Sequence, residues 1–135
     1  MVTITGEYQG ELHCSAVHGP SGTALATDAP KDNQGRGESF SPTDLVATAL
    51  ATCIATTMAI VGRRHGVEIG NVRYEVTKEM TTQGPRKIAR LKSRFWMPAA
   101  ARAVPEGVLE KAAHSCPVHQ SLAPEVERLI EFIWE

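Results

Sequence analysis

Two stretches of the sequence hold cysteines in settings where a thiol could react. The first is "HSCPVHQSL", residues 114–122, in which Cys116 directly precedes Pro117 and lies three residues before His119. Because proline favours the first position of a helix, Cys116 is expected at the cap, where free backbone N–H groups and the helix dipole stabilise a thiolate. The second is Cys53, inside a long apolar stretch. Burial there makes a thiol inert unless a positive partner offsets its desolvation.

Both cysteines also have interpretations that involve no thiol chemistry. Taken alone, Cys53 is typical of a small apolar core residue, and His119 of an ordinary half-exposed histidine. Cys116 and His119 have a ligand-like spacing, but a structural zinc site needs four ligands, commonly as two close pairs. Cys53 has no Cys or His within four residues. We therefore expect no metal site and no cofactor.

The segment that carries Cys53 is predicted to be one long helix, from about Pro42 to His65. Ser41 can cap this helix, and Asp44 completes a capping box with it. The basic residues of the last turn complement the negative end of the helix dipole, and Gly66 ends the helix.

This helix has two distinct faces. One face is an apolar stripe, and the opposite face holds only small side chains. The helix is therefore expected to be enclosed, with close backbone approach on the side of the small residues. A chain of this length offers little else to enclose it, and we expect a second subunit to do so. The apolar stripe is predicted to contain Val46, Leu50, Cys53, Thr57 and Val61; the small residues are Ala51, Thr52, Ala55, Thr56 and Ala59.

The first third of the chain is predicted to be β-structure, with strands over residues 3–12, 12–19 and 22–30. Cys14 alternates with apolar neighbours in the second strand and is expected to be buried. The polar, glycine-containing segment 31–41 is predicted to be a loop, and Arg36 and Glu38 are its notable charges.

The remaining elements are a hairpin over residues 71–98, short helices from about Pro105 and from Pro117, and a final strand over 126–135. This order predicts an α+β fold with antiparallel sheet. Five basic residues on the hairpin are expected to form a solvated face, since no stacking aromatics alternate with them. They are Arg86, Lys87, Arg90, Lys92 and Arg94.

The composition is that of a folded single domain over residues 1–135. The net charge of −1 and the 42% hydrophobic content argue against a nucleic-acid binder and against a disordered chain. The longest uncharged stretch, Leu45–Gly62, is near the lower limit for a membrane span, but its Ala and Thr residues favour a buried helix. Three cysteines without a secretion signal fit a reducing cytosol, so we expect a cytoplasmic protein without membrane contact.

Two motifs together resemble the OsmC/Ohr family of osmotically inducible and organic-hydroperoxide-resistance proteins. They are "GRGESFSPTDLVATALATCIATTMAI" and, some sixty residues later, "HSCPVHQSL". The resemblance covers nearly the whole chain. It implies an OsmC-like α+β fold with antiparallel sheets around a long central Ala-rich helix, in an intertwined homodimer.

The resemblance also implies a role for each cysteine. Cys53 matches the cysteine that attacks the peroxide and becomes a sulfenic acid, and Cys116 matches the resolving cysteine that then forms a disulfide with it. The implied substrates are organic hydroperoxides, and the implied reductant is an outside dithiol of the lipoyl type. The function implied is that of a thiol-dependent peroxidase.

One part of the family pattern is altered here. The family's peroxidases use an arginine from the loop before the long helix, steadied by an acid directly after the Ser-Pro pair. Arg36 matches the arginine, but Thr43 stands at the acid's place and Asp44 follows it. Glu38 could substitute from the loop. The departure leaves an alternative open: a non-catalytic OsmC-like dimer that binds a small apolar or thiol ligand, or senses oxidants.

Overall fold

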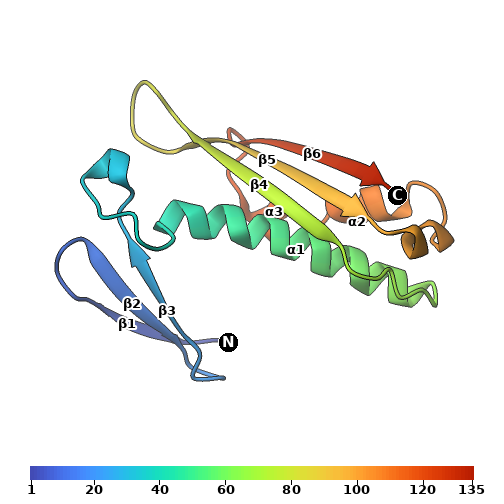
Figure 1. Cartoon of the computed structure of the whole chain (residues 1–135), viewed down its shortest axis with the longest axis horizontal. Coiled ribbons are helices and arrows are strands. Elements are labelled where there is room, and N and C mark those ends of the chain that lie inside the picture. Colours follow the sequence, from blue (N-terminus) through green and yellow to red (C-terminus); the bar gives the residue numbers. More distant parts are fainter. The chain divides into compact units, whose positions relative to one another are not determined.

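The computed structural model describes residues 1–135, which form two compact units, Met1–Val46 and Ala47–Glu135. The boundary falls near the start of the long helix α1, Pro42–Arg64. The first unit contains a three-stranded sheet and the loop that leads to α1. The second contains most of α1, another three-stranded sheet and short helices (Figure 1). This mixture confirms the predicted α+β class.

The sheet of the first unit is an antiparallel meander, as predicted. Its register places Tyr8 and Cys14 in one cross-strand row on one face, and His13 opposite Asp28 on the other face. Cys14 is half-buried, whereas the sequence predicted a buried residue. The neighbouring strand is exposed along its whole length, so Cys14 is only partly covered. The three strands are β1 (Ile4–Tyr8), β2 (His13–His18) and β3 (Ala24–Asp28).

The loop between β3 and α1 folds back on the end of β3. It contains one short 3-10 turn, η1 (Lys31–Asn33). The backbone N–H of Gly37 donates to the carbonyl oxygen of Ala29 at 3.2 Å. A Cβ atom at Gly35 would overlap with the backbone of Ala29, so the close approach of the two chain segments requires glycine there. Arg36 therefore projects from a tightly folded loop.

Helix α1 begins with the predicted capping box. The Ser41 hydroxyl oxygen accepts a hydrogen bond from the backbone N–H of Asp44 at 3.1 Å. In return, the Asp44 carboxylate accepts one from the backbone N–H of Ser41 at 2.9 Å. The helix ends at Arg64, one residue before the predicted end.

The buried face of α1 differs from the predicted one. Ile54 and Met58 are completely buried, and Gly62 packs so closely that an added Cβ would lie 2.6 Å from Ile69 Cγ2. Leu50 belongs to both the predicted and the observed buried face. Each of the other predicted residues lies one position before a buried residue, which corresponds to a rotation of about 100° around the helix. Because α1 is apolar or small on every side, periodicity alone could not select the face. The buried residues are Ala47, Leu50, Ala51, Ile54, Met58 and Gly62.

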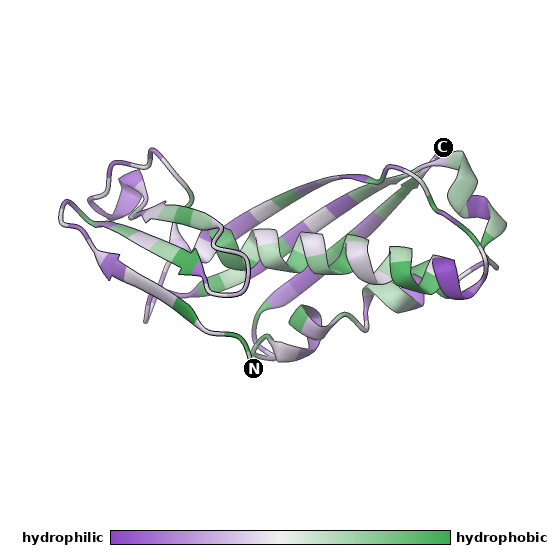
Figure 2. Ribbon diagram, turned by 90° about the horizontal axis from the view of Figure 1, so that it is seen from below, coloured by the Kyte–Doolittle hydropathy of each residue, from purple (hydrophilic) through white to green (hydrophobic).

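By length and composition, α1 could cross a membrane. Its most apolar window has a mean hydropathy of 2.0, and 33% of that window is buried within the chain. The core helix of a soluble protein satisfies the same criteria. Figure 2 shows the hydrophobic residues along α1 and the alternation of polar and apolar residues along the longer strands.

The sheet of the second unit is mixed, not wholly antiparallel. β4 and β5 form the predicted hairpin, but β6 pairs with β5 in parallel. The chain reaches β6 through a long connection with short helices, and such a crossover returns the strand in the same direction. In Figure 1 the three strands run side by side along α1. They are β4 (Arg73–Met80), β5 (Ile88–Met97) and β6 (Glu127–Trp134).

The inner face of this sheet supplies much of the core. Alternate residues of β5 are completely buried: Leu91, Ser93, Phe95 and Met97. On the outer face, the side chains of Arg90 and Arg94 pair with Glu127 and Glu131 of β6, each at 2.9 Å. These exposed ion pairs confirm that the basic residues of the hairpin form a solvated face.

Short helices connect β5 to β6. They are η2 (Ala99–Ala103), α2 (Val108–Ala113) and α3 (Pro117–Ser121). α3 begins at Pro117, as predicted. α2 begins at Val108 rather than near Pro105, because Gly107 adopts a left-handed conformation (φ 82°) at its N-cap.

Candidate functional site

Cys53 and Cys116 meet within the second unit. Cys53 lies on α1 and is half-buried, whereas Cys116 is completely buried at the N-cap of α3. The side chain of Cys53 lies close enough to Cys116 to raise the pKa of its thiol. The sulfur of Cys116 also accepts a hydrogen bond from the backbone N–H of His119 at 3.3 Å. The two cysteines therefore lie near one another, with Cys116 at the cap position that the sequence predicts for it.

The environment of Cys116 favours its protonated form. Burial raises the pKa of the Cys116 thiol from an ordinary value of 9.0 to about 11. The backbone N–H groups of His119 and Val118 act in the opposite direction, while the hydrogen bond to Cys53 and the charge that Cys53 can carry raise this pKa further. Cys116 thus keeps its proton at neutral pH.

Arg128 of β6 holds the helix that carries Cys116. Its guanidinium group donates to the carbonyl oxygens of His119 at 3.2 Å and of Leu122 at 3.1 Å, and also to that of Ala123. These carbonyls lie at the end of α3, where no intrahelical donor remains for them. These hydrogen bonds from Arg128 join α3 to the sheet, and the motif around Cys116 does not predict them.

His119 is half-buried, in line with the interpretation of an ordinary histidine. Its ring meets that of His114 edge-on, with the ring centroids 5.7 Å apart. Burial lowers the pKa of His119, and the nearby charges of Arg128 and His114 lower it further. The imidazole is therefore held in its neutral form near the cysteine pair. No group of three or more His, Cys, Asp or Glu side chains in residues 1–135 is arranged to hold a metal ion.

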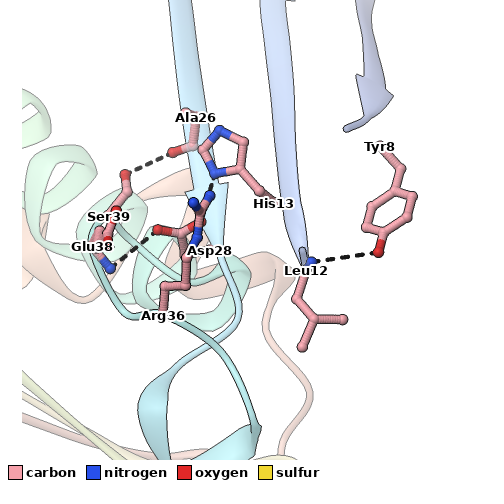
Figure 3. Close-up of polar contacts among 8 residues, drawn as sticks. All are labelled: Tyr8, Leu12, His13, Ala26, Asp28, Arg36, Glu38 and Ser39. Carbon is pink, nitrogen blue, oxygen red and sulfur yellow. Dashed lines mark hydrogen bonds and ion pairs between the residues drawn. The ribbon is translucent and has the colours of Figure 1, made fainter. Parts of the chain in front are cut away.

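Arg36 and Glu38, the two other predicted site residues, lie in the first unit and meet at Asp28 (Figure 3). Arg36 Nη2 lies 3.6 Å from Asp28 Oδ1, and the backbone N–H of Glu38 donates to Asp28 Oδ2 at 3.1 Å. His13 Nδ1 donates to Asp28 Oδ1 at 2.5 Å. Glu38 contributes its backbone to this cluster, whereas the acid beside Arg36 is Asp28.

Asp28 is the residue that the sequence analysis missed. It is only 1% exposed, and the hydrogen bond from His13 is the main cause that lowers the pKa of its carboxyl group. The available signal in the sequence was an acidic residue at the end of an otherwise apolar strand, just before a polar loop. Its partners come from positions 13, 36 and 38, so the tertiary fold alone identifies it.

Comparisons with known proteins identify the family and the fold. A family model described as OsmC-like protein matches residues 35–128, which include both cysteines and Arg36. A solved structure from Psychrobacter arcticus 273-4, of a proposed osmotic stress induced and detoxification response protein, is 35% identical. It superposes with a TM-score of 0.85, covering 98% of this chain and 96% of that one.

Two more distant structures share the fold. One is the organic hydroperoxide resistance protein OsmC of Legionella pneumophila, at 13% identity and a TM-score of 0.74, covering 98% of this chain and 96% of that one. The other is the organic hydroperoxide resistance protein OhrB of Bacillus subtilis, at 16% identity and a TM-score of 0.70, covering 98% and 97%. No match was found among curated proteins. With its paired cysteines, its two-sheet fold and a family match over most of its length, the chain belongs to the OsmC-like protein family.

Proposed function

We propose that the protein is a cysteine-based peroxidase that reduces organic hydroperoxides to alcohols. The observation that carries this proposal is that Cys53 lies close enough to Cys116 to raise the pKa of its thiol. Two neighbouring thiols are the arrangement that disulfide formation needs. The family includes proteins of organic hydroperoxide resistance, which favours this substrate class.

The reaction would proceed in two steps at the cysteines. The Cys53 thiolate attacks one peroxide oxygen, the O–O bond breaks, and the alkoxide leaves as the alcohol after it takes a proton. Cys53 is thereby oxidised to a sulfenic acid. The sulfur of Cys116 then attacks the Cys53 sulfur, the S–O bond breaks, and water leaves as the disulfide forms. An external dithiol, for which we propose the lipoyl type, reduces this disulfide and becomes a cyclic disulfide itself.

The different environments of the two sulfurs fit these roles. While Cys53 is anionic, its charge helps to keep the proton on Cys116. Oxidation of Cys53 to the neutral sulfenic acid removes that charge. The backbone N–H groups of His119 and Val118 continue to lower the pKa of Cys116, whose thiolate is the nucleophile of the second step, against the effect of burial, which raises it.

A thiolate in a half-buried site needs a cation to offset its desolvation. We assign this role to Arg36, supplied by the same chain or by a second subunit, with Glu38 in the loop beside it. The side chain of Arg36 is 45% exposed, so part of its guanidinium group remains available beyond the pair with Asp28.

The active form is proposed to be a cytoplasmic homodimer, without nucleic-acid or membrane partners. The β1–β3 sheet carries exposed apolar side chains on one face, among them Ile4 (64%), Tyr8 (63%) and Leu25 (47%). The small-residue side of α1 borders an open hollow of about 340 Å³, lined in part by Ala55, Ala59 and Ile60. Such surfaces are typical of contacts between subunits.

A second function is favoured by the altered acid position. Thr43 stands where the family peroxidases have an acid, and the Asp44 carboxylate is engaged with the Ser41 backbone. A chain without an activated thiol could instead bind a small apolar or thiol compound, or sense oxidants, in the same fold.

Steady-state turnover distinguishes the two functions. Reduced protein is mixed with cumene hydroperoxide and dihydrolipoamide, and peroxide consumption is followed in wild type, Cys53→Ser and Cys14→Ser. A peroxidase loses turnover only in Cys53→Ser, because Cys14 is outside the proposed reaction. No turnover in the wild type, or equal turnover in all three proteins, would reject the proposed reaction and leave the binding function.

A further inference from the structure

Arg128 projects from the inner face of the second sheet. In the parallel pairing of β5 with β6 it lies opposite Leu91, which is completely buried. Paired residues of neighbouring strands point to the same side of a sheet, so Arg128 shares the largely apolar inner face with Leu91. Its Nε atom is buried and has no hydrogen-bond partner in the chain. A cation in such a place is costly unless other strong bonds hold it.

The bonds that hold Arg128 all lead to main-chain carbonyl groups in and just after α3. Nη1 donates to the carbonyl oxygen of His119 at 3.2 Å. Nη2 donates to that of Leu122 at 3.1 Å and to that of Ala123. Hydrogen bonds from an ionised donor are stronger than those between neutral groups. The guanidinium group is therefore a firm attachment of α3 to the sheet.

Helix α3 depends on such an attachment because it is very short. It has five residues, Pro117–Ser121, and an isolated helix of this length is not stable in water. At its start, the Cys116 sulfur accepts the backbone N–H of His119 at 3.3 Å. Cysteine sulfur is a weak acceptor, so this cap alone holds the helix weakly. The stronger bonds come from Arg128.

One residue links the sulfur to the arginine. The backbone N–H of His119 donates to the Cys116 sulfur, and the carbonyl group of the same residue accepts from Arg128. Loss of the guanidinium group would release this carbonyl, and with it the backbone that fixes the sulfur. Disulfide formation tolerates only a narrow range of separations between the two cysteines. The position of α3 therefore decides how readily Cys116 can bond with Cys53.

We propose that Arg128 is a positioning residue for Cys116, because it holds α3 on the second sheet with the Cys116 sulfur placed to bond with Cys53. This inference rests on the proposed function, in which Cys116 resolves the sulfenic acid of Cys53. The guanidinium group acts through the backbone of α3 and not on either sulfur. Its loss should therefore change how well the two thiols pair.

The pairing of the two thiols can be measured without peroxide. Reduced protein is equilibrated with mixtures of reduced and oxidised glutathione, and the Cys53–Cys116 disulfide is quantified by mass spectrometry. The two thiols lose two electrons and two protons, and one oxidised glutathione becomes two reduced ones. The equilibrium gives the effective concentration of one thiol toward the other. Every protein carries Cys14→Ser, so that only one intramolecular disulfide can form.

Two arginine variants are compared with this parent protein. Arg128→Met removes the charge and the donors but keeps an unbranched apolar side chain. Arg94→Met is the matched control, because Arg94 also contacts β6, through Glu131, but on the exposed outer face of the same sheet. Urea unfolding and backbone hydrogen exchange are measured in parallel. Exchange should rise in the peptide over residues 117–123 of Arg128→Met and stay unchanged in α1.

Arg128→Met is expected to lower the effective concentration by about tenfold, since a small displacement of a reacting group can cost about a hundredfold in rate. Iodoacetamide should meanwhile alkylate Cys116 faster, because the loosened helix no longer buries the thiol. A thiol that is more accessible and yet pairs less well has been displaced. Arg94→Met should match the parent in both measurements. A merely stabilising role would lower the urea midpoint and leave the effective concentration unchanged.

Each result bears on a specific claim. Equal effective concentrations in Arg128→Met and its parent would overturn the role of Arg128 and leave the proposed function standing. If reduced wild type releases no alcohol from cumene hydroperoxide, the peroxidase is rejected, while the glutathione equilibrium still decides whether Arg128 positions Cys116. A parent protein that forms no Cys53–Cys116 disulfide at any glutathione ratio would overturn both.

A second variant covers the case in which Arg128→Met does not fold. Arg128→Gln keeps a single donor nitrogen on a shorter side chain, which cannot replace the bonds to all three carbonyl groups. It should lower the effective concentration in the same direction. Equality with the parent would again overturn the proposal.

Discussion

Cys53 lies close enough to Cys116 to raise the pKa of its thiol, so the N-cap of α3 and the middle of α1 meet at a pair of thiols. The two residues are far apart in the sequence, and only the packing of α3 against α1 brings them together. The two thiols differ in their surroundings, because Cys116 is completely buried and Cys53 is only half-buried.

Cys116→Ser should retain the first chemical step and lose the second. Cys53 remains in place to attack the peroxide, but no thiol is available to resolve the sulfenic acid. With an equimolar amount of peroxide and no reductant, the variant should release one alcohol per chain and accumulate a sulfenic acid on Cys53. Dimedone labelling followed by mass spectrometry detects it. Cys14→Ser is the control and should behave as wild type. Absence of label in Cys116→Ser would mean that Cys53 is not the residue that attacks the peroxide.

The raised pKa of Cys116 predicts a loss of stability in alkaline solution. Between an ordinary pKa of 9.0 and the folded value of about 11, the unfolded chain releases the Cys116 proton while the folded protein retains it. Stability from this group is therefore complete below pH 9.0 and is lost as the pH rises toward about 11. Urea unfolding in this range should show a steeper decline for wild type than for Cys116→Ser. Parallel curves for the two proteins would contradict the assignment.

The lowered pKa of His119 predicts a loss of stability in acidic solution. Burial and the charges of Arg128 and His114 lower its folded pKa from 6.5, so the unfolded chain takes up a proton first as the pH falls. Its contribution is present above pH 6.5 and is lost as the pH falls through the folded value. The difference in unfolding free energy between wild type and His119→Gln should therefore shrink on acidification from neutral pH. A constant difference would show that this ring titrates alike in both states.

The capping box of α1 should contribute measurably to stability. Ser41→Ala removes the side-chain acceptor for the backbone N–H of Asp44 and should cost about 1 kcal/mol in the free energy of unfolding. Thr52→Ala is the matched control on the same helix, since Thr52 is exposed and alanine has the higher helix propensity. The measurement is the urea midpoint at unchanged slope. Equal midpoints for Ser41→Ala and wild type would mean that the box does not stabilise the helix.

Local signals in the sequence predicted those parts of the fold that depend on neighbouring residues. The start of α1 follows from Ser41, Pro42 and Asp44, and the inner face of β5 follows from strict alternation. The start of α3 after Cys116 follows from Pro117 in the same way. Each of these features is set by a cap, a proline or a period of two, which the chain carries locally.

The features that sequence reasoning missed depend on distant partners. The buried stripe of α1 is set by contacts such as that of Gly62 with Ile69. Because the helix is apolar or small on every side, its sequence does not indicate which face is buried. The parallel pairing of β6 depends on the route of the connection, which no single segment specifies. Asp28 was not recognised because its role exists only when strand β2 and the loop meet at its carboxylate.

The most direct test is the identity of the bond that forms on oxidation. Reduced wild-type protein is treated with an equimolar amount of cumene hydroperoxide, alkylated, and mapped by mass spectrometry without reduction. We predict one disulfide, between Cys53 and Cys116, formed in proportion to the alcohol released, with Cys14 recovered as a free alkylated thiol. Consumption of the peroxide with Cys53 and Cys116 still reduced, or a disulfide that involves Cys14, would contradict the proposed mechanism.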